Sequence, residues 1–243
     1  MIMEYREYKD ILYRAFKENG CGELLSDESA QKLYEFARIL VETNKAFNLT
    51  AITEEKEVIL KHFVDCASIS KHIPVNSTLV DVGCGAGFPS LPIAILRSDV
   101  SVTSLDSTTK KIDFINRTAK ELSLNNIVAI SSRAEDFAKD NREKFDIATS
   151  RAVARLNILD ELCIPLIKVG GLFIAMKSSR GEIELQEAQN GIKKLGAELE
   201  TVDKSQLTLD DTTIERETYV FKKTSKTPSQ YPRNYSQIAK KPL

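Results

Sequence analysis

Apolar residues in the first third of the chain recur at helical spacing. One set follows Ser26 and Asp27, both of which suit a helix N-cap, and a second set follows Thr53. A polar connector, NKAFNLT, separates the two stretches. The apolar stripes are Leu33, Phe36, Ala37, Leu40 and Val41 in the first stretch, and Ile59, Phe63, Ala67 and Ser70 in the second. We therefore expect residues 1–73 to form an N-terminal helical cap.

From Thr78 onward, short apolar runs alternate with helical patterns. The runs are TLVDV, SVTSLD, NIVAIS, FDIATS and GLFIAMK. The helical pattern after the second run has Ser107 as a candidate cap, and the pattern before the fifth ends in Gly170 and Gly171, as helices often do. Strands that alternate with helices of this length form parallel βαβ units, so the sequence predicts a doubly wound sheet.

Two further runs near the end, AELETVDKSQL and RETYVFKK, leave no room for a helix between them and predict an antiparallel hairpin. Five parallel strands plus a terminal hairpin are typical of Rossmann-like class I methyltransferases, which use S-adenosylmethionine (SAM), and not of dehydrogenases. We predict an α/β domain over residues 74–224 with a mostly parallel seven-stranded sheet, and a basic tail over residues 225–243.

The overall composition excludes several classes of protein. The chain has 243 residues, 42% of them apolar and 28% charged, with a net charge of −1, so no global basic balance indicates nucleic acid. No apolar run is long enough for a membrane span or a signal peptide. Four widely spaced cysteines and only two histidines favour free thiols over a metal site. We expect a cytoplasmic monomer without a metal.

The tail departs from this neutral balance. After Glu217 there is no acidic residue, and Tyr231 and Tyr235 are interleaved with lysines and with Arg233. Cations next to aromatic rings suit single-stranded RNA, whereas a disordered, solubilising end is the alternative. If the tail contacts RNA, removing the residues after Thr224 should weaken RNA binding and leave SAM affinity unchanged.

A glycine loop follows the first predicted strand. Gly83, Gly85 and Gly87 are spaced G-x-G-x-G, whereas the dinucleotide fingerprint needs its third glycine at position 88, which is Phe88. This spacing favours a loop that holds the amino-acid part of SAM over a tight turn without a ligand. Ser90, at the end of the loop, has no functional explanation from sequence.

Two later loops complete a nucleoside site. Asp106 ends the second predicted strand about 20 residues after the loop, where an acid accepts hydrogen bonds from ribose hydroxyls. Its alternative role is to cap the helix that begins near Ser107, and an acid there also argues against NADP. The loop after the third strand contains Ala134 and Glu135, which are placed to contact adenine in this fold.

The motifs also match a known family. The chain resembles the ribosomal RNA small-subunit methyltransferase G family from about Asn44 to Leu243. The shared motifs are NLTAIT, KHFVDCASI, LVDVGCGAGFPSLPIAI, LDSTTKKIDFI, SRAEDF, TSRAVARL, GGLFIAMK and the terminal YPR…KKPL. The chain departs from the family pattern at Ser90, where glycine is usual, and in a tail with fewer glycines and lysines.

The resemblance implies that SAM is used to methylate N7 of one guanine in 16S rRNA of the small ribosomal subunit. It also implies which residues contact SAM, namely Gly83, Phe88, Ala134, Glu135 and Arg151.

Guanine N7 has an in-plane lone pair and no proton, so its methylation needs alignment and desolvation but no general base. The chain accordingly has no NPPY-like motif and no motif cysteine after the fourth strand. Arg151 and Arg155 lie there instead. Arg151 is the candidate catalytic residue, binding a phosphate, stacking on a base or holding the SAM carboxylate. A surface arginine that caps the next helix is the alternative.

The remaining substrate-binding candidates each have a structural alternative. His62 and Asp65 are one helical turn apart, but a histidine between a cap and a sheet is usually structural. Asn44 and Asn48 either read a base edge or stabilise turns. Lys177, at the end of the fifth strand, either reaches the RNA backbone or is a solvated strand end.

Three other functions stay open at this stage. A SAM-dependent enzyme acting on a small molecule is disfavoured by the basic tail. An NAD-dependent oxidoreductase is disfavoured by Phe88 and the terminal hairpin. A non-catalytic RNA-binding assembly factor with the same fold would differ in leaving rRNA methylation unchanged when it is absent.

Overall fold

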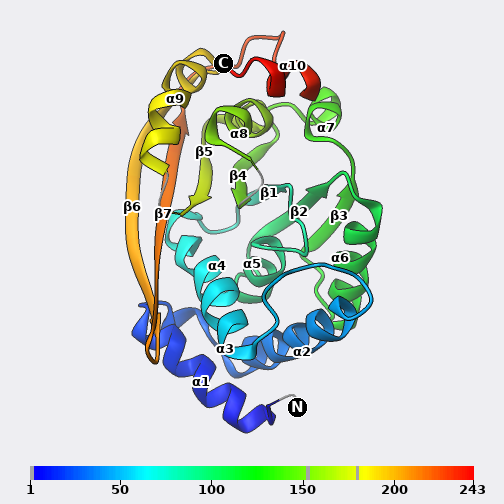
Figure 1. Ribbon diagram of the computed structural model, residues 1–243. Helices are drawn as coiled ribbons and strands as arrows, with labels where there is room; N and C mark the ends of the chain where they lie inside the picture. The colour runs from blue at the N-terminus through cyan, green and yellow to red at the C-terminus, as the bar shows by residue number, and fades with distance from the viewer. Residues whose placement is uncertain (1–2, 152–153, 179–180) are drawn as a thin grey trace.

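A computed structural model describes residues 3–151, 154–178 and 181–243. The N-terminal part is helical (Figure 1), with α1 at Tyr5–Glu18, a 3₁₀ turn at Gly22–Leu24 and α2 at Asp27–Asn44. Ser26 caps α2, because its Oγ accepts the Ser29 N–H at 3.1 Å while Ser29 Oγ accepts the Ser26 N–H at 2.8 Å. Ser26 is thus confirmed as the cap, and Asp27 is the first helical residue.

The second predicted stretch is one winding segment with an irregular middle. It consists of α3 at Glu55–Val58, a π-helical turn at Ile59–Val64, α4 at Asp65–Ser68 and a 3₁₀ turn at Ile69–His72. The predicted stripe of Ile59, Phe63, Ala67 and Ser70 is buried, as expected. The π turn contains His62 and ends just before Asp65, and such turns recur at functional sites.

The sheet has seven strands in the order β3-β2-β1-β4-β5-β7-β6. The first five strands are parallel, β7 runs antiparallel to β5, and β6 pairs with β7 as the predicted hairpin. The predicted fold class is therefore confirmed. The strands are β1 Thr78–Val82, β2 Ser101–Asp106, β3 Ile127–Ser131, β4 Phe145–Arg151, β5 Ile167–Lys177, β6 Ala197–Leu209 and β7 Thr212–Lys223.

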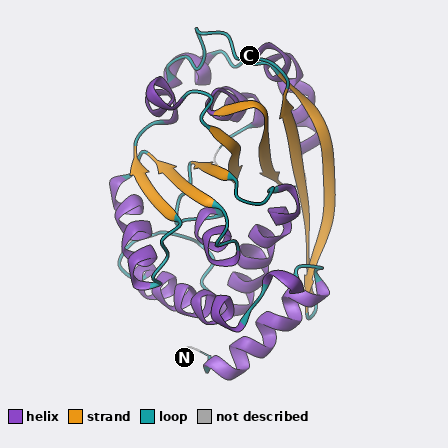
Figure 2. Cartoon of the chain, turned by 180° about the vertical axis from the view of Figure 1, so that it is seen from behind, coloured by secondary structure: helices purple, strands orange, loops and turns teal. Residues whose placement is uncertain are grey.

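Helices cover both faces of this sheet (Figure 2). Adjacent residues of β1 point to opposite faces, so Leu79 packs in one apolar cluster with Ile93 while Val80 packs in another with Leu159. The helices after the cap are α5 Ser90–Leu96, α6 Thr109–Glu121, α7 Ala134–Asn141, α8 Leu156–Cys163, α9 Gly181–Lys194 and α10 Tyr235–Lys240, and a 3₁₀ turn spans Ile164–Leu166.

Two local predictions were wrong. Gly170 and Gly171 lie inside β5 and do not end a helix, since a Cβ on Gly171 would lie 2.5 Å from the carbonyl oxygen of Asp146 on β4. Close approach of the two strands therefore explains this glycine. The N-cap of α6 is Thr108 and not Ser107.

The helical cap shares its core with the sheet. The Phe36 and Phe88 rings lie 5.3 Å apart between centroids, and both belong to one apolar cluster with residues of α1, α2 and α6. At its far end the β6–β7 hairpin is fastened to the cap, because Asp210 pairs with Arg14 at 2.8 Å and with Lys56 at 2.7 Å. The division into 1–73, 74–224 and 225–243 stays a prediction.

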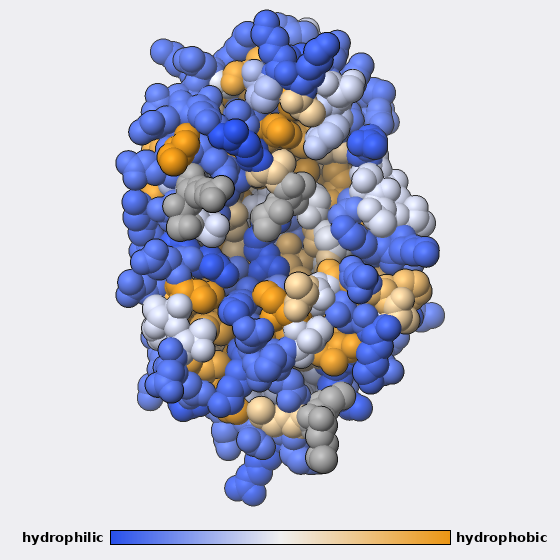
Figure 3. Space-filling view, viewed as in Figure 1, coloured by the Kyte–Doolittle hydropathy of each residue, from blue (hydrophilic) through white to orange (hydrophobic). Residues whose placement is uncertain are grey.

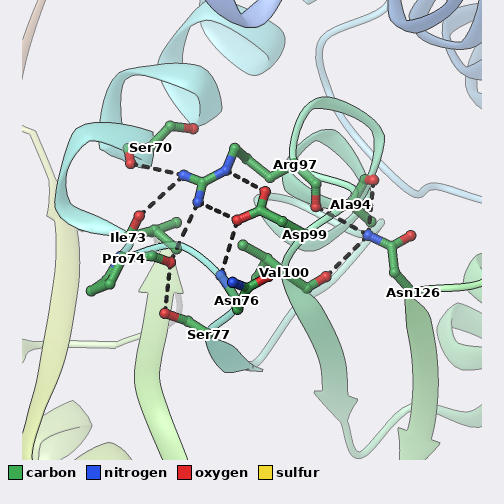
Figure 4. A network of polar contacts seen from close by, with 10 residues as sticks. All are labelled: Ser70, Ile73, Pro74, Asn76, Ser77, Ala94, Arg97, Asp99, Val100 and Asn126. Atoms are coloured by element: carbon green, nitrogen blue, oxygen red, sulfur yellow. Dashed lines mark hydrogen bonds and ion pairs between the residues drawn. The ribbon is translucent and has the colours of Figure 1, made fainter.

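A polar network joins the last turn of the cap to the amino ends of the strands (Figure 4). The Arg97 guanidinium donates to the carbonyls of Ser70, Ile73 and Pro74, and it pairs with Asp99 through two contacts of 2.7 Å. The Asn126 amide donates to three more carbonyls nearby. The amino ends of these strands are therefore taken up by structural contacts. The carboxyl ends, at the opposite edge of the sheet, remain available for a ligand. Among the described residues, no helix is both long and apolar enough to cross a membrane.

Candidate functional site

The carboxyl ends of β1, β2, β4 and β5 open into a cleft of about 890 Å³, visible as a hollow in the face shown in Figure 3. It lies where the strand order reverses between β1 and β4, which is where ligands bind in open α/β sheets. The helical cap forms the opposite wall through Thr50, Lys61, His62 and Asp65. Residues from the cap, the glycine loop and three strand ends thus meet in one place.

The glycine loop forms the floor of the cleft. The N–H groups of Gly83 and Cys84 donate to the Leu105 carbonyl at 2.7 and 3.0 Å, which fixes the loop to the end of β2. Gly85 has a φ of +57°, and within the described chain a Cβ there would meet nothing inside 4 Å. A Cβ on Gly87 would instead lie 2.5 Å from Leu91 Cδ1. Gly85 therefore faces open space, and Gly87 permits close helix packing.

Asp81 anchors the main chain at Ser90, the position that the sequence left without a role. The Ser90 N–H at the start of α5 donates to Asp81 Oδ2 at 3.2 Å, so this carboxyl fixes the far end of the loop. Asp81 is completely buried, and burial raises its pKa to about 7. The contact is made by the Ser90 main chain, so the departure from the glycine of the family pattern leaves it intact.

Asp106 borders the cleft and lies just before Thr108, the N-cap of α6. Its Oδ1 accepts the Thr108 N–H at 2.9 Å and its Oδ2 accepts the Gly85 N–H at 3.1 Å. Lys111 Nζ lies 3.6 Å from the same carboxylate. Asp106 is thus not the N-cap of α6. Its side chain joins the turn before this helix to the glycine loop, and its ribose role stays a prediction.

A second cavity of about 140 Å³ lies on the other side of Gly83 and Asp106. Its walls include Ala134 and Glu135, at the start of α7, and Tyr235 of the tail. The structure thus brings together the three loops that the sequence singled out. Tyr235 was expected at an RNA surface, and its position beside Ala134 and Glu135 had no signal in the sequence.

Arg151 is partly buried and makes a network of polar contacts. Its Nη1 donates to Asp65 Oδ2 at 3.0 Å and to the Lys61 carbonyl at 3.1 Å, and its Nη2 lies 3.0 Å from His62 Nδ1. The guanidinium carbon also lies 5.0 Å from the centroid of the Phe88 ring. Arg151 is therefore not a surface arginine capping α8, whose N-cap is Arg155.

His62 is held as a neutral ring. It stacks on Phe88 with centroids 4.1 Å apart, and its Nε2 lies 3.1 Å from Thr50 Oγ1. Burial and the nearby Arg151 charge lower the pKa of His62 to about 3. Since a guanidinium only donates, the contact with Arg151 requires an Nδ1 without a proton and an Nε2–H that donates to Thr50, whereas the Lys61 carbonyl, 3.1 Å from the same Nδ1, would accept a proton only in the other tautomer. A ring with this pKa is a poor general base at neutral pH.

Asp65 has a second arginine partner that sequence reasoning missed. Arg216 of β7 donates from Nε to Asp65 Oδ1 at 3.0 Å, so both carboxylate oxygens are engaged. Arg216 lines the cleft although it lies 65 positions after Arg151 in the chain. No local motif marks it, because a hairpin residue reaches the site only through the folded sheet.

Of the other predicted substrate-binding residues, some border the cleft and others do not. Lys177 borders the cleft, where its Nζ donates to the Ala154 carbonyl at 2.7 Å and pairs with Glu184 at 2.8 Å. Arg155 borders it too, paired with Glu187 but more than half exposed. Asn44 stabilises a turn, since its amide donates to the Thr50 carbonyl and its Oδ1 accepts the N–H groups of residues 49 and 50. Asn48 is exposed.

Arg233 lies away from the large cleft, paired with the buried Glu161 of α8 at 2.6 Å. In the motif SRAVA, residues 152–153 are outside the described residues.

The large cleft is positively charged. Its lining contains six lysines and arginines against three carboxylates, although the protein as a whole carries a net charge of −1. The cations are Lys61, Lys111, Arg151, Arg155, Lys177 and Arg216, and the acids are Asp65, Asp106 and Glu184. Such a lining favours an anionic ligand.

Comparison with known proteins agrees with this architecture. Residues 29–213 match the family model described as rRNA small subunit methyltransferase G. A ribosomal RNA small subunit methyltransferase G from Clostridium beijerinckii is 42% identical, with 98% of this chain and 99% of that protein covered. The one from Staphylococcus carnosus is 46% identical over 90% of this chain and 92% of its own length.

Solved structures bear on the fold alone. The Geobacter metallireducens precorrin-6y C5,15-methyltransferase superposes with a TM-score of 0.53 at 13% identity, covering 74% of this chain and 92% of that one. The Streptomyces coelicolor geranyl diphosphate C-methyltransferase gives 0.51 at 15% identity, covering 65% and 78%. Fold, family model and full-length relatives agree with the resemblance seen in the motifs, and the chain belongs to the rRNA small subunit methyltransferase G family.

Proposed function

We propose that this protein uses SAM to methylate N7 of a guanine in 16S rRNA of the small ribosomal subunit. The observation that carries the proposal is the composition of the cleft. One wall is a glycine loop held by Asp106, and the lining is rich in cations in a protein of net charge −1. The first feature suits a nucleoside cofactor and the second suits an RNA backbone.

The residues present fit SAM along its whole length. The methionine part would lie over Gly85, where the described chain leaves open space, and the ribose hydroxyls would face Asp106. Adenine would occupy the small cavity beside Ala134 and Glu135. A guanidinium has five N–H donors, and the Arg151 contacts with Asp65, Lys61 and His62 use three of them. The remaining donors are available to the SAM carboxylate or to the substrate.

When bound, SAM supplies an electrophilic methyl group on a sulfonium. The protein's part is to bind and align the guanine and to exclude water, because N7 presents its lone pair without losing a proton. The cleft fits a reaction without a base. His62 has its pKa lowered to about 3, and both oxygens of Asp65 are occupied by arginines. Phe88, His62 and Arg151, which stack on one another, line the cleft instead and give it an aromatic and cationic border for a base.

We also propose that the enzyme acts as a monomer in the cytoplasm. The large apolar side chains that are exposed in the described chain belong to separate elements, among them Phe47, Val128, Val169 and Leu199. Light scattering coupled to size-exclusion chromatography should give the mass of one chain, about 27 kDa.

Mass spectrometry of 16S rRNA tests the proposal directly. Ribosomal RNA from cells lacking the protein should contain one 7-methylguanosine fewer than RNA from the parent strain, and the intact gene should restore it. An unchanged modification pattern would favour the non-catalytic assembly factor. Turnover on small acceptors with none on 30S subunits or rRNA would favour the small-molecule enzyme.

A further inference from the structure

The C-terminal residues, expected to form an RNA-binding tail, are packed on the body of the protein. The Arg142 guanidinium donates to the main-chain carbonyls of Thr227, Pro228 and Tyr231. Thr227 Oγ1 donates to the Leu195 carbonyl at 2.7 Å, and the Tyr231 ring is buried. The last helix, α10, lies beside α7 and α8 at one end of the molecule (Figure 1). The segment therefore has a fixed course over the protein.

A buried ion pair fixes this course just before α10. Arg233 donates from Nη2 to Glu161 Oε2 at 2.6 Å and from Nε to Glu161 Oε1 at 2.9 Å, and its main-chain N–H also donates to Oε1 at 2.8 Å. Glu161 is completely buried in α8. A bidentate contact of this kind fixes the orientation of the Arg233 side chain as well as its position. Five residues after Arg233, Ile238 of α10 is also buried, so Tyr235 lies between two anchored positions.

Tyr235 thereby reaches the small cavity next to Ala134 and Glu135. Its main-chain N–H donates to Glu135 Oε1 at 3.2 Å, and the Arg133 guanidinium carbon lies 5.8 Å from the centroid of its ring. The side chain lines the cavity while 39% of the residue's surface stays exposed. An aromatic ring is thus held at the mouth of a cavity that Gly83 and Asp106 border on the inner side.

We propose that Tyr235 forms the outer wall of the adenine subsite, so that the C-terminal segment is part of the cofactor site. This inference rests on the proposed function, in which that cavity takes the adenine of SAM. The ring gives the base an aromatic contact, which the small side chain of Ala134 cannot supply. The main-chain N–H holds one oxygen of Glu135 and leaves the other to accept the exocyclic amine of adenine.

Titration calorimetry on the full-length chain tests this with two probes, SAM and 5′-methylthioadenosine, which lacks the amino-acid part. Tyr235→Ala should raise the Kd for both probes about tenfold, and Tyr235→Phe should bind both like the wild type. Tyr235→Leu keeps apolar bulk and should fall between them. Gln237→Ala, exposed on the same helix, is the matched control and should change neither Kd.

The possible outcomes distinguish a failure of the Tyr235 assignment from a failure of the proposed function. Wild-type affinity in Tyr235→Ala, while the wild-type protein binds SAM, would overturn the inference and leave the proposed function standing. A loss seen with SAM but not with 5′-methylthioadenosine would place the ring at the other end of the cofactor and would also overturn it. Weaker binding of an rRNA fragment at saturating SAM, with unchanged SAM affinity, would return the segment to an RNA-binding role. A wild-type protein that binds neither probe would remove the proposed function and the inference with it.

Discussion

Asp65 and Arg151 form a buried ion pair, with Oδ2 of the first 3.0 Å from Nη1 of the second, that joins α4 of the helical cap to the end of β4. The other Asp65 oxygen accepts from Arg216, so one carboxylate bridges two arginines from two strands. Because Asp65 is only 3% exposed, these charges are largely shielded from water. This pair connects the cap, the sheet and the hairpin at the centre of the cleft.

Asp65→Asn should lower the free energy of unfolding by about 3 kcal/mol, because it leaves two partly buried arginines without a counter-charge. Urea denaturation measures this. Glu57→Gln is the matched control, since it removes the surface partner of Lys61 and should cost less than about 1 kcal/mol. Equal effects of the two substitutions would show that the buried pair contributes no more than a surface one.

Asp106→Ala should weaken SAM binding more than about tenfold, because it removes a charged acceptor and releases the Gly85 amide. Calorimetry gives the Kd. Asp136→Ala replaces an exposed acid of α7, paired with Lys139, and should leave the Kd unchanged. A wild-type Kd for Asp106→Ala would refute the ribose assignment.

Gly85→Ala and Gly87→Ala should separate binding from stability. At Gly85 a methyl group fits without a clash and costs about 1 kcal/mol through its positive φ, but it enters the space over which we place SAM and should abolish tight binding. At Gly87 the methyl group meets Leu91, so Gly87→Ala should cost about 2–3 kcal/mol. Urea denaturation and calorimetry on both variants measure the two effects, and identical losses of stability would contradict this distinction.

Arg155→Ala should weaken binding of an rRNA fragment without changing SAM affinity, because Arg155 is an exposed cation at the cleft. The plot of log K against log salt should become shallower by about 0.7 for one lost phosphate contact. Lys32→Ala, which also removes a cation paired with a glutamate but lies on α2, should keep the wild-type slope. If Arg155→Ala keeps that slope as well, Arg155 does not contact phosphate.

Asp160→Asn should change how stability depends on pH. Burial raises the pKa of Asp160 to about 8, so between pH 4 and 8 the folded protein retains a proton that the unfolded chain has released. This linkage makes the wild type less stable as pH rises, by about 1.4 kcal/mol per pH unit at most, and Asp160→Asn should lack the decline. Denaturation at several pH values measures the difference.

Asp99 provides a control, because its contribution to stability should change with pH in the opposite direction to that of Asp160. Its hydrogen bonds with Arg97 lower the pKa of Asp99 to about 2, so the stability it contributes is present above pH 4 and is lost as pH falls towards 2. Asp99→Asn should therefore differ from the wild type most at neutral pH, and the difference should vanish only below pH 2. Parallel pH profiles for the wild type and Asp160→Asn would contradict the assignment of Asp160.

The sequence by itself determined the fold class, the order of the strands along the chain, the hairpin and the glycine loop. These features depend on periodicity and on short motifs, which are encoded in neighbouring residues. The Ser26 cap and the spacing of Gly83, Gly85 and Gly87 belong to the same category. A prediction from local sequence was wrong where a tertiary contact sets the residue type. Gly171 was predicted to end a helix, but it is required by the close approach of β4.

Only the tertiary structure decided which distant residues share the site. Arg216 pairs with Asp65 because the hairpin packs against β5 and the cap, and Tyr235 reaches Glu135 because Arg233 is held by Glu161. Contacts across such sequence separations leave no periodic pattern, since each depends on the packing of whole elements. The tail shows the consequence most clearly. Its basic composition predicted an RNA contact, whereas the Arg233–Glu161 ion pair and the buried Tyr231 ring hold the segment so that Tyr235 lines a cavity bordered by Gly83.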